Sequence, residues 1–179
     1  MESINKAFIS IETTGLNSLN DKIIEIAILK IDKNNLKSLF HHIINPEKDI
    51  DKNISNIIGY SNEELKKYPK ITEISDSFIN FINSSTLIGH NNDFIFGFLN
   101  KELNVEITNE KIDVFEIAKK KYPNENNSTD NLKKKLNIIN NSTFSSSLNE
   151  VLELPKILDI LSSKIKWNPN GHKRNFKKD

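Results

Sequence analysis

Three runs of β-forming residues within the first 44 positions constrain the fold of this chain more than any other feature. They are Ala7–Ile11, Ile23–Ile31 and Leu36–Ile44. Their close spacing favours an antiparallel meander of three strands. The turn signal Asn45-Pro46 then ends the segment.

The rest of the chain combines helical patterns with short strand patterns. Helices are predicted from apolar residues at helical spacing and from capping residues such as Asp51, Ser61 and either Ser128 or Thr129. The predicted helices are Ile50–Gly59, Ser61–Lys67, Thr72–Phe81, Asn92–Leu103, Thr129–Leu136 and Leu148–Ile165, the last with Pro155 inside it or at a kink. Short strands are predicted at Thr86–Gly89 and at the start of Ile112–Lys121, which then turns helical. This order predicts an α/β domain with a mixed sheet.

Length and charge indicate one globular domain followed by a basic tail. The chain has 179 residues, 36% hydrophobic and 27% charged, which allows a single core and differs from a fully disordered composition. Residues 164–179 hold six Lys/Arg and one acid, a charge of +5, so residues 1–163 carry −4. We therefore predict a domain over residues 1–163 and a flexible basic tail over residues 164–179.

Other features narrow the setting in which the protein works. The chain has no cysteine, which excludes disulfides and thiolate metal sites. No apolar run approaches the ~20 residues of a membrane helix, and Met1–Lys6 shows no signal-peptide pattern. We expect a cytoplasmic protein with no membrane contact.

Several separated motifs resemble one known family. The segment Phe8–Lys30 resembles the first motif region of the DnaQ-like (DEDDh) 3′-5′ exonucleases, which include the proofreading subunits and domains of bacterial replicative polymerases such as DNA polymerase III. The likeness extends over about residues 6–162 and implies a ribonuclease-H-like fold, a five-stranded mixed sheet flanked by helices. The further motifs, in family order, are Ile44-Asn45-Pro46, Gly59-Tyr60-Ser61, Pro69, Leu87–Asn91, Phe98-Leu99, Asp113 and Ser128–Leu136.

The family hydrolyses phosphodiesters with two divalent cations held by four acids, and a histidine acts as general base. By this resemblance the first motif, an Asp and a Glu on one face of the first strand, falls at Ser10 and Glu12. The Asp of the second motif falls at Ile95, and the His and Asp of the third fall at Ser145 and Glu150. The resemblance therefore implies a degenerate site in which Glu12 and Glu150 are at most weak metal ligands. No cofactor is expected, or Mg²⁺ or Mn²⁺ if activity remains.

Neighbouring polar residues are interpreted as structural. Asp93 precedes Ile95 by two residues, a rotation of about 200° along a helix, so it is predicted to point away from the site and to cap the helix that Phe94 begins. Asp113 is interpreted as structural or as a helix cap. The four histidines are interpreted as structural rather than as the general base: His41, His42, His90 and His172.

Nucleic-acid contacts are predicted in two places. Those in the body are Thr13, Thr14 and Asn91, and those in the tail are Lys173, Arg174, Lys177 and Lys178. Tail cations would meet phosphates, while Trp167 and Phe176 would stack on bases or dock on a protein partner. A solvated terminus without a role is the plain alternative.

Three functions stay open. The preferred hypothesis is a catalytically inactive exonuclease-fold protein, a nucleic-acid-binding or scaffolding subunit of a larger complex. The first alternative is a weakly active or altered metal-dependent 3′-5′ exonuclease that uses Glu12 and Glu150. The second is a pure protein-interaction module. The expected partners are a protein in a nucleic-acid-processing complex and single-stranded DNA or RNA.

Overall fold

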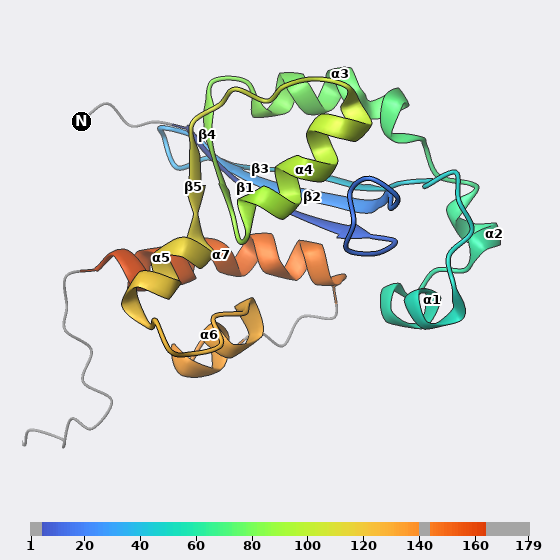
Figure 1. Ribbon diagram of the computed structural model, residues 1–179. Helices are drawn as coiled ribbons and strands as arrows, with labels where there is room; N and C mark the ends of the chain where they lie inside the picture. Colours follow the sequence, from blue (N-terminus) through green and yellow to red (C-terminus); the bar gives the residue numbers. More distant parts are fainter. Residues whose placement is uncertain (1–4, 140–143, 164–179) are drawn as a thin grey trace, which may run out of the picture.

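A five-stranded mixed sheet forms the centre of the molecule in the computed structural model, which describes residues 5–139 and 144–163 (Figure 1). The strands are β1 (Asn5–Thr13), β2 (Ile23–Ile31), β3 (Lys37–Ile43), β4 (Ser85–Gly89) and β5 (Lys111–Asp113), in the spatial order β3-β2-β1-β4-β5. β1 pairs antiparallel with β2, and β2 with β3, which confirms the predicted meander. β4 runs parallel to both β1 and β5.

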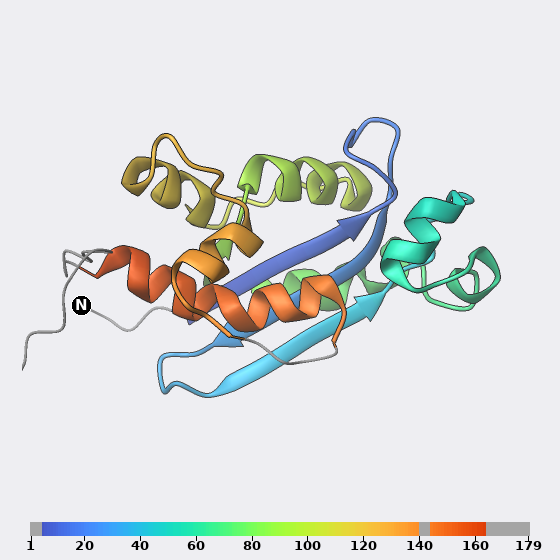
Figure 2. The same ribbon diagram turned by 90° about the horizontal axis from the view of Figure 1, so that it is seen from below.

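Helices cover both faces of the sheet. On one face, α3 (Ile71–Ile82) and α4 (Asn92–Leu103) pack on β1 and β2 in an apolar core. On the other, α5 (Val114–Lys121), α6 (Thr129–Lys135) and α7 (Ser146–Ser162) form a second core, with α7 lying against β1 and β2 (Figure 2). A third, smaller cluster joins the sheet to α1 (Lys52–Ile58) and α2 (Asn62–Leu65). The predicted ribonuclease-H-like architecture is confirmed.

Strand alternation divides β1 between the two cores. Ala7, Ile9 and Ile11 belong to the core under α3 and α4. Phe8 belongs to the core under α7, so Ser10 and Glu12, at the same period of two, face α7 as well. The end of β1 therefore presents polar side chains to the start of α7, and this is where the candidate site lies.

Two local predictions need correction. The last helix begins at Ser146, two residues before the predicted Leu148, and Pro155 lies inside it without ending it. Asp93 is not a cap, because α4 begins at Asn92. The Asp113 carboxylate instead accepts hydrogen bonds from the backbone N–H groups of Asn91 (3.1 Å) and Asn92 (2.7 Å). Asp113, at the end of the neighbouring strand β5, therefore caps the start of α4 in place of Asp93.

The remaining sequence predictions on the ends of the domain are limited by what is described. No helix of residues 5–139 and 144–163 is long and apolar enough to cross a membrane. The predicted basic tail, residues 164–179, lies outside the described residues, so the domain boundary at residue 163 stays a prediction.

Candidate functional site

Hydroxyl groups occupy both oxygens of the Glu150 carboxylate. Ser10 Oγ donates to Glu150 Oε2 at 2.7 Å, and Thr129 Oγ1 donates to Glu150 Oε1 at 2.7 Å. Ser10 is only 3% exposed, so its hydroxyl needs an acceptor inside the protein. The Ser10–Glu150 hydrogen bond joins β1 to α7, at the two positions where the family resemblance places acids of a metal site.

Glu12 lies directly opposite Glu25 in the β1–β2 ladder. Burial raises the pKa of the Glu12 carboxyl, and the charges of Glu25 and Glu150 raise the pKa further, while a hydrogen bond from the Ser146 hydroxyl partly lowers it. Like charges opposite each other on adjacent strands destabilise a sheet. The surroundings of Glu12 therefore disfavour the ionised form of its carboxyl group.

Replacing this carboxylate is expected to stabilise the domain. A group whose pKa is higher in the folded state contributes stability below its unfolded pKa, about 4.3, and that contribution is lost as pH rises through the folded pKa. Glu12→Gln should raise the free energy of unfolding at pH 7.5 by roughly 0.2–1 kcal/mol, with a smaller gain at pH 4. Urea unfolding at both pH values checks this, with exposed Glu106→Gln as the charge-matched control. A Gln variant that is less stable at both pH values would contradict the assignment.

Glu25 forms the centre of a second polar cluster. Its side chain is only 4% exposed, and its Oε1 accepts hydrogen bonds from His41 Nε2 (2.8 Å), Ser147 Oγ (2.5 Å) and Ser145 Oγ. These donors come from β3 and from the start of α7. Ser145, where the family's histidine was predicted, therefore binds an acid of the sheet.

Sequence reasoning missed this cluster. It placed His41 far along the chain from the site, whereas the β2–β3 pairing brings His41 to Glu25. The available signal was Glu25 itself, a single acid within a strand whose first seven residues are all buried. A buried acid needs donors, and a search for them would have pointed to neighbouring strands.

Ile95 is part of the apolar core, as its residue type suggests. It is 4% exposed and belongs to the cluster that contains Ile9 and Ile11. A Cβ on Gly89 would lie 2.7 Å from Ile95 Cδ1, so the isoleucine fills the space beside the end of β4. The second-motif position offers no polar atom.

His90 and Asp113 both make contacts that stabilise the fold. The His90 ring packs edge-on against Phe115, and its Nδ1 is buried without a hydrogen-bond partner among the described residues. Burial lowers the pKa of His90 despite the opposing charges of Glu150 and Asp113. Asp113 accepts from Phe115 N at 2.8 Å as the N-cap of α5, besides its bonds to the α4 start. The prediction of Asp113 as a helix cap is confirmed.

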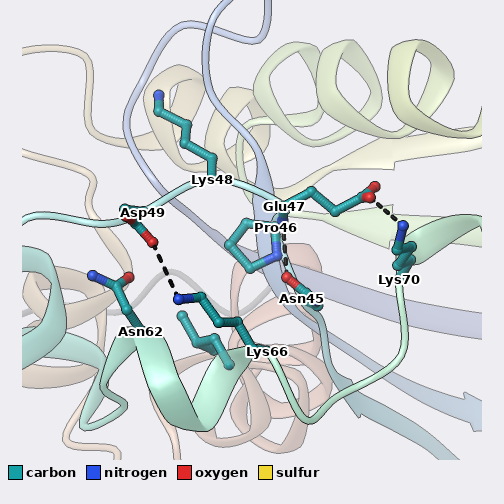
Figure 3. A pocket seen from close by; sticks show the side chains of 9 residues that line it. Asn45, Pro46, Glu47, Lys48, Asp49, Asn62, Lys66 and Lys70 are labelled. Atoms are coloured by element: carbon teal, nitrogen blue, oxygen red, sulfur yellow. Dashed lines mark hydrogen bonds and ion pairs between the residues drawn. The ribbon is translucent and has the colours of Figure 1, made fainter.

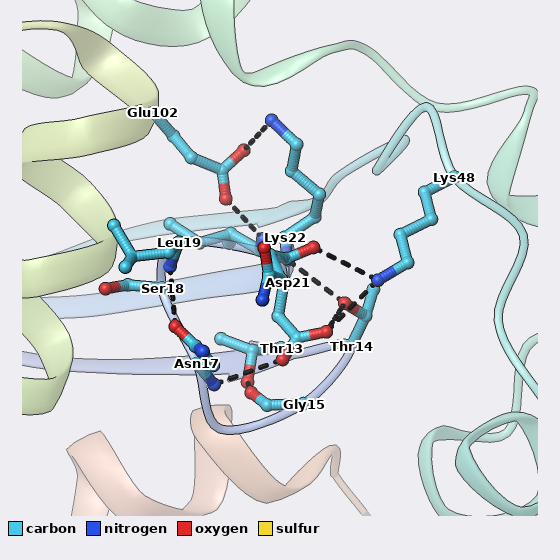
Figure 4. Close-up of polar contacts among 12 residues, drawn as sticks. Thr13, Thr14, Gly15, Asn17, Ser18, Leu19, Asp21, Lys22, Lys48 and Glu102 are labelled. Carbon is cyan, nitrogen blue, oxygen red and sulfur yellow. Dashed lines mark hydrogen bonds and ion pairs between the residues drawn. The ribbon is translucent and has the colours of Figure 1, made fainter.

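Thr13, the last residue of β1, and Thr14, which follows it, hold the β1–β2 loop together (Figure 4). Thr13 Oγ1 donates to Gly15 O at 2.5 Å, while Thr14 Oγ1 donates to Asp21 Oδ1 at 3.1 Å and accepts from Lys22 N at 3.0 Å. A Cβ at Gly15 would collide with the Asp21 carboxylate at 2.4 Å. These contacts explain the Thr-Thr-Gly sequence through the loop itself.

The remaining predicted nucleic-acid contacts stay untested. Asn91 is exposed and adopts a left-handed conformation at φ 72° before α4, and its backbone N–H is used by Asp113. The tail residues lie outside the described residues, as does His172: Lys173, Arg174, Lys177 and Lys178.

Known proteins have sequences similar to that of this chain over most of its length. A family model described as Exonuclease (RNase T) matches residues 8–145. The chain is 33% identical over 188 residues to the DNA polymerase III subunit epsilon of Buchnera aphidicola subsp. Acyrthosiphon pisum (strain APS), covering 93% of this chain and 78% of that protein. The chain belongs to the DnaQ-like (RNase T) exonuclease family. The protein of the same name from Rickettsia prowazekii (strain Madrid E) is 36% identical over 151 residues, which cover 78% of this chain and 66% of that protein.

Solved structures of exonucleases share the fold. Exonuclease X in complex with 5′ overhanging duplex DNA superposes with a TM-score of 0.69 at 19% identity, covering 90% of this chain and 93% of that one. Escherichia coli exonuclease I in complex with a dT13 oligonucleotide gives a TM-score of 0.74 at 13% identity, over 88% of this chain and 41% of that one. At these identities the likeness establishes the fold.

The family's two-cation chemistry does not fit the residues present. Within the described part of the chain, no three His, Asp or Glu side chains form a group that could hold a metal ion. Ser10 presents a hydroxyl hydrogen to Glu150, and Ile95 is apolar, whereas Mg²⁺ requires several oxygen ligands in near-ideal geometry.

A hollow of about 450 Å³, the acidic hollow, opens beside Glu12 and Glu25. Glu12 and Glu25 contribute carboxylates, while the walls come from the end of α1, the residues after it and the start of α7. Its lining is Glu12, Glu25, Ile57, Ile58, Gly59, Tyr60, Phe144, Ser145 and Ser146.

A second hollow, of about 530 Å³, lies between the segment after β3 and α2 (Figure 3). Its lysines are ion-paired: Lys48 with Asp21 at 3.1 Å, Lys66 with Glu63 at 2.9 Å, and Lys70 with Glu47. Because each of these lysines already has an acidic partner, the hollow has little positive charge with which to bind a phosphate.

Proposed function

We propose that this chain is a non-hydrolytic member of the exonuclease family that serves as a nucleic-acid-binding or scaffolding subunit of a larger complex. The observation that carries the proposal is the state of Glu150. Both of its carboxylate oxygens accept hydroxyl hydrogens, from Ser10 and Thr129, at the position where the family resemblance implies metal coordination. A metal ion would have to displace both donors and would gain few acidic ligands in return.

The names of the relatives favour a second candidate, an altered metal-dependent 3′-5′ exonuclease. The two relatives described above are polymerase III epsilon subunits. Glu12, Glu25 and Glu150 are close enough for the two other charges to act on the pKa of Glu12. A cation that relieved this repulsion would have a favourable electrostatic setting, even without the family's full ligand set.

Degradation of a 3′-labelled single-stranded oligonucleotide in Mn²⁺ separates the two candidates. We expect no metal-dependent shortening by the wild-type chain or by Glu12→Gln, because the site lacks a general base and most of its ligands. Shortening by the wild type that Glu12→Gln abolishes would overturn the proposal and establish the exonuclease. Glu106→Gln, an exposed acid, controls for the change of charge.

Fluorescence anisotropy with the same oligonucleotide separates binding from pure scaffolding. Saturable binding at low salt is expected if the chain contacts nucleic acid, and it should weaken as salt rises. A variant of the 179-residue chain that combines Lys173→Gln, Arg174→Gln, Lys177→Gln and Lys178→Gln should lose most of this affinity. No binding by the wild type would leave a protein-interaction module as the function.

A further inference from the structure

Lysines gather where α5 and α6 end. Lys119–Lys121 lie in the last turn of α5, and Lys133–Lys135 lie in the last turn of α6. The two ends meet, because Lys135 Nζ lies 4.5 Å from the centre of the ring of Tyr122, which caps α5. These six residues, the lysine cluster, therefore form one basic surface from two segments of the chain.

Three lysines of the cluster have structural partners. Lys121 Nζ donates to two backbone carbonyls at the end of α7, both at 3.1 Å. Lys133 forms an ion pair with Glu153 of α7 at 3.1 Å, and Lys135 forms one with Glu125 at 2.6 Å. The contacts of Lys121 and Lys133 hold the ends of α5 and α6 against α7.

The other three lysines have exposed side chains and little compensating charge. Lys120 and Lys134 form no ion pair with any residue of 5–139 or 144–163. Lys119 has a 3.6 Å ion pair with Glu116, and because both side chains are more than half exposed, this pair contributes little. The helix dipoles favour cations at these positions, but most of the positive charge still faces solvent. It is therefore open to an anionic partner.

The basic tail begins beside the lysine cluster. The end of α7, at Ser162, is held by Lys121, and residues 164–179 follow directly. Residues 114–179 hold thirteen Lys/Arg and seven acids, a charge of +6, whereas residues 1–113 carry −5. An asymmetry of this size favours contact with nucleic acid through the basic part of the chain.

The acids of the degenerate site lie at the other end of α7. Ser146 and Ser147, at its start, bind Glu12 and Glu25. The 17 residues of α7 span about 25 Å, whereas salt screens exposed charges beyond roughly 8–10 Å. A phosphate bound near Lys121 would therefore feel little repulsion from these carboxylates.

We infer that the lysine cluster binds the phosphates of single-stranded nucleic acid. The inference rests on the proposed nucleic-acid-binding role and assigns that role to a surface away from the degenerate site. Exposed lysines act as point charges for phosphates. In the adjoining tail, Trp167 and Phe176 supply rings on which unpaired bases can stack, which favours a single strand over an acidic protein.

Fluorescence anisotropy of a labelled twelve-nucleotide oligo(dT), at low salt and without divalent ions, tests the cluster in the 179-residue chain. We expect the dissociation constant to rise at least about tenfold in a variant that spares the three structural lysines. The slope of log affinity against log salt should also fall by about 0.7 for each lysine that contacts a phosphate. An unchanged constant and slope overturn the inference. The variant combines Lys119→Gln, Lys120→Gln and Lys134→Gln.

Three exposed lysines on β3, α1 and the segment after α2 provide the charge-matched control. Their replacement should change the dissociation constant less than about twofold, because they lie outside the cluster. Equal losses in the two variants would mean that binding follows net charge alone, which contradicts the inference. The control combines Lys37→Gln, Lys52→Gln and Lys67→Gln.

Two further measurements make the result independent of how the glutamine variant folds. Arginine at the same three positions should keep the affinity within about threefold, because a guanidinium group also binds phosphate. The ¹⁵N-labelled native chain should show saturable shifts at the amides of Lys120 and Lys134 when oligo(dT) is added. Loss of binding in the arginine variant, or shifts confined to other surfaces, overturns the inference. The arginine variant combines Lys119→Arg, Lys120→Arg and Lys134→Arg.

A competitor and a nuclease assay keep the other outcomes apart. A twelve-residue glutamate peptide that displaces oligo(dT) at equal concentration would make an acidic protein the ligand and overturn the inference. Shortening of a 3′-labelled oligonucleotide by the native chain in Mn²⁺ would overturn the proposed function, whatever the titrations show. Absence of both binding and shortening would overturn the lysine cluster as a nucleic-acid site and leave scaffolding as the proposed function.

Discussion

A variant that combines Ser10→Asp, Ile95→Asp, Ser145→His and Glu150→Asp is expected to shorten a 3′-labelled single-stranded oligonucleotide in Mn²⁺ at least about 10³-fold faster than the native chain. The four changes restore the acids and the base that the family resemblance implies, on a fold that already positions β1 against α7. A positioned general base alone contributes about 10²–10⁴-fold, and metal coordination adds charge stabilisation in the transition state. The readout is the rate of product formation at saturating enzyme.

The rebuilt variant should also depend on metal for stability. Asp at position 10 would face the acid at 150, where Ser10 and Glu150 now share a 2.7 Å hydrogen bond, and Asp at 95 would enter an apolar core. Both changes destabilise the metal-free domain through repulsion and burial of charge. We therefore expect its Tm to fall without Mn²⁺ and to rise by several degrees on Mn²⁺ addition, while the native chain responds weakly.

Adding Glu12→Gln to the rebuilt variant provides the matched control. Activity should fall by at least about 10²-fold, because the one acid of the first motif that the native chain keeps is then lost. A rebuilt variant that folds and binds Mn²⁺ yet stays inactive would show that more than these four side chains separates this chain from its active relatives. Nuclease activity in the native chain would show that the four losses are compensated.

The sequence predicted the elements well where local signals and tertiary packing agree. The helix Asn92–Leu103 was predicted because apolar side chains recur at helical spacing across it, although its cap was placed at Asp93. The α7 start was predicted late because Ser145, Ser146 and Ser147 carry no apolar periodicity, although they are held by Glu12 and Glu25. Such contacts between distant segments leave no trace in the local pattern.

The candidate site was predicted in part for the same reason. Ser10, Glu12 and Glu150 were found through motif spacing, and the structure brings Ser10 and Glu150 into direct contact. Glu25 and His41 were missed because their contact depends on the β2–β3 register, which pairs His41 with Ala27 and so places it diagonally from Glu25. A one-residue slip in that register would turn His41 to the other face.

Removal of the Glu25 carboxylate is expected to destabilise the domain more than any other single polar change. Glu25→Ala would leave His41, Ser145 and Ser147 without their shared acceptor, and would release the start of α7 from β2 and β3. Breaking a buried charged contact of this kind costs about 3–5 kcal/mol. The same change at exposed Glu106 should stay within about 0.5 kcal/mol, as is usual for surface positions. Urea unfolding measures both.

Glu25→Gln tests whether the hydrogen bonds that the Glu25 side chain accepts or its negative charge contributes more to the stability of the domain. Its amide oxygen can still accept from the two serines, so we expect a smaller loss than for alanine. In a double-mutant cycle, Ser147→Ala should cost about 1–2 kcal/mol in the native background and much less once Glu25→Ala is present, because the hydroxyl has then already lost its acceptor. Additive losses would mean that Ser147 and Glu25 stabilise the fold independently. The hydrogen bonds of Glu25 would then contribute little to holding the start of α7 against the sheet.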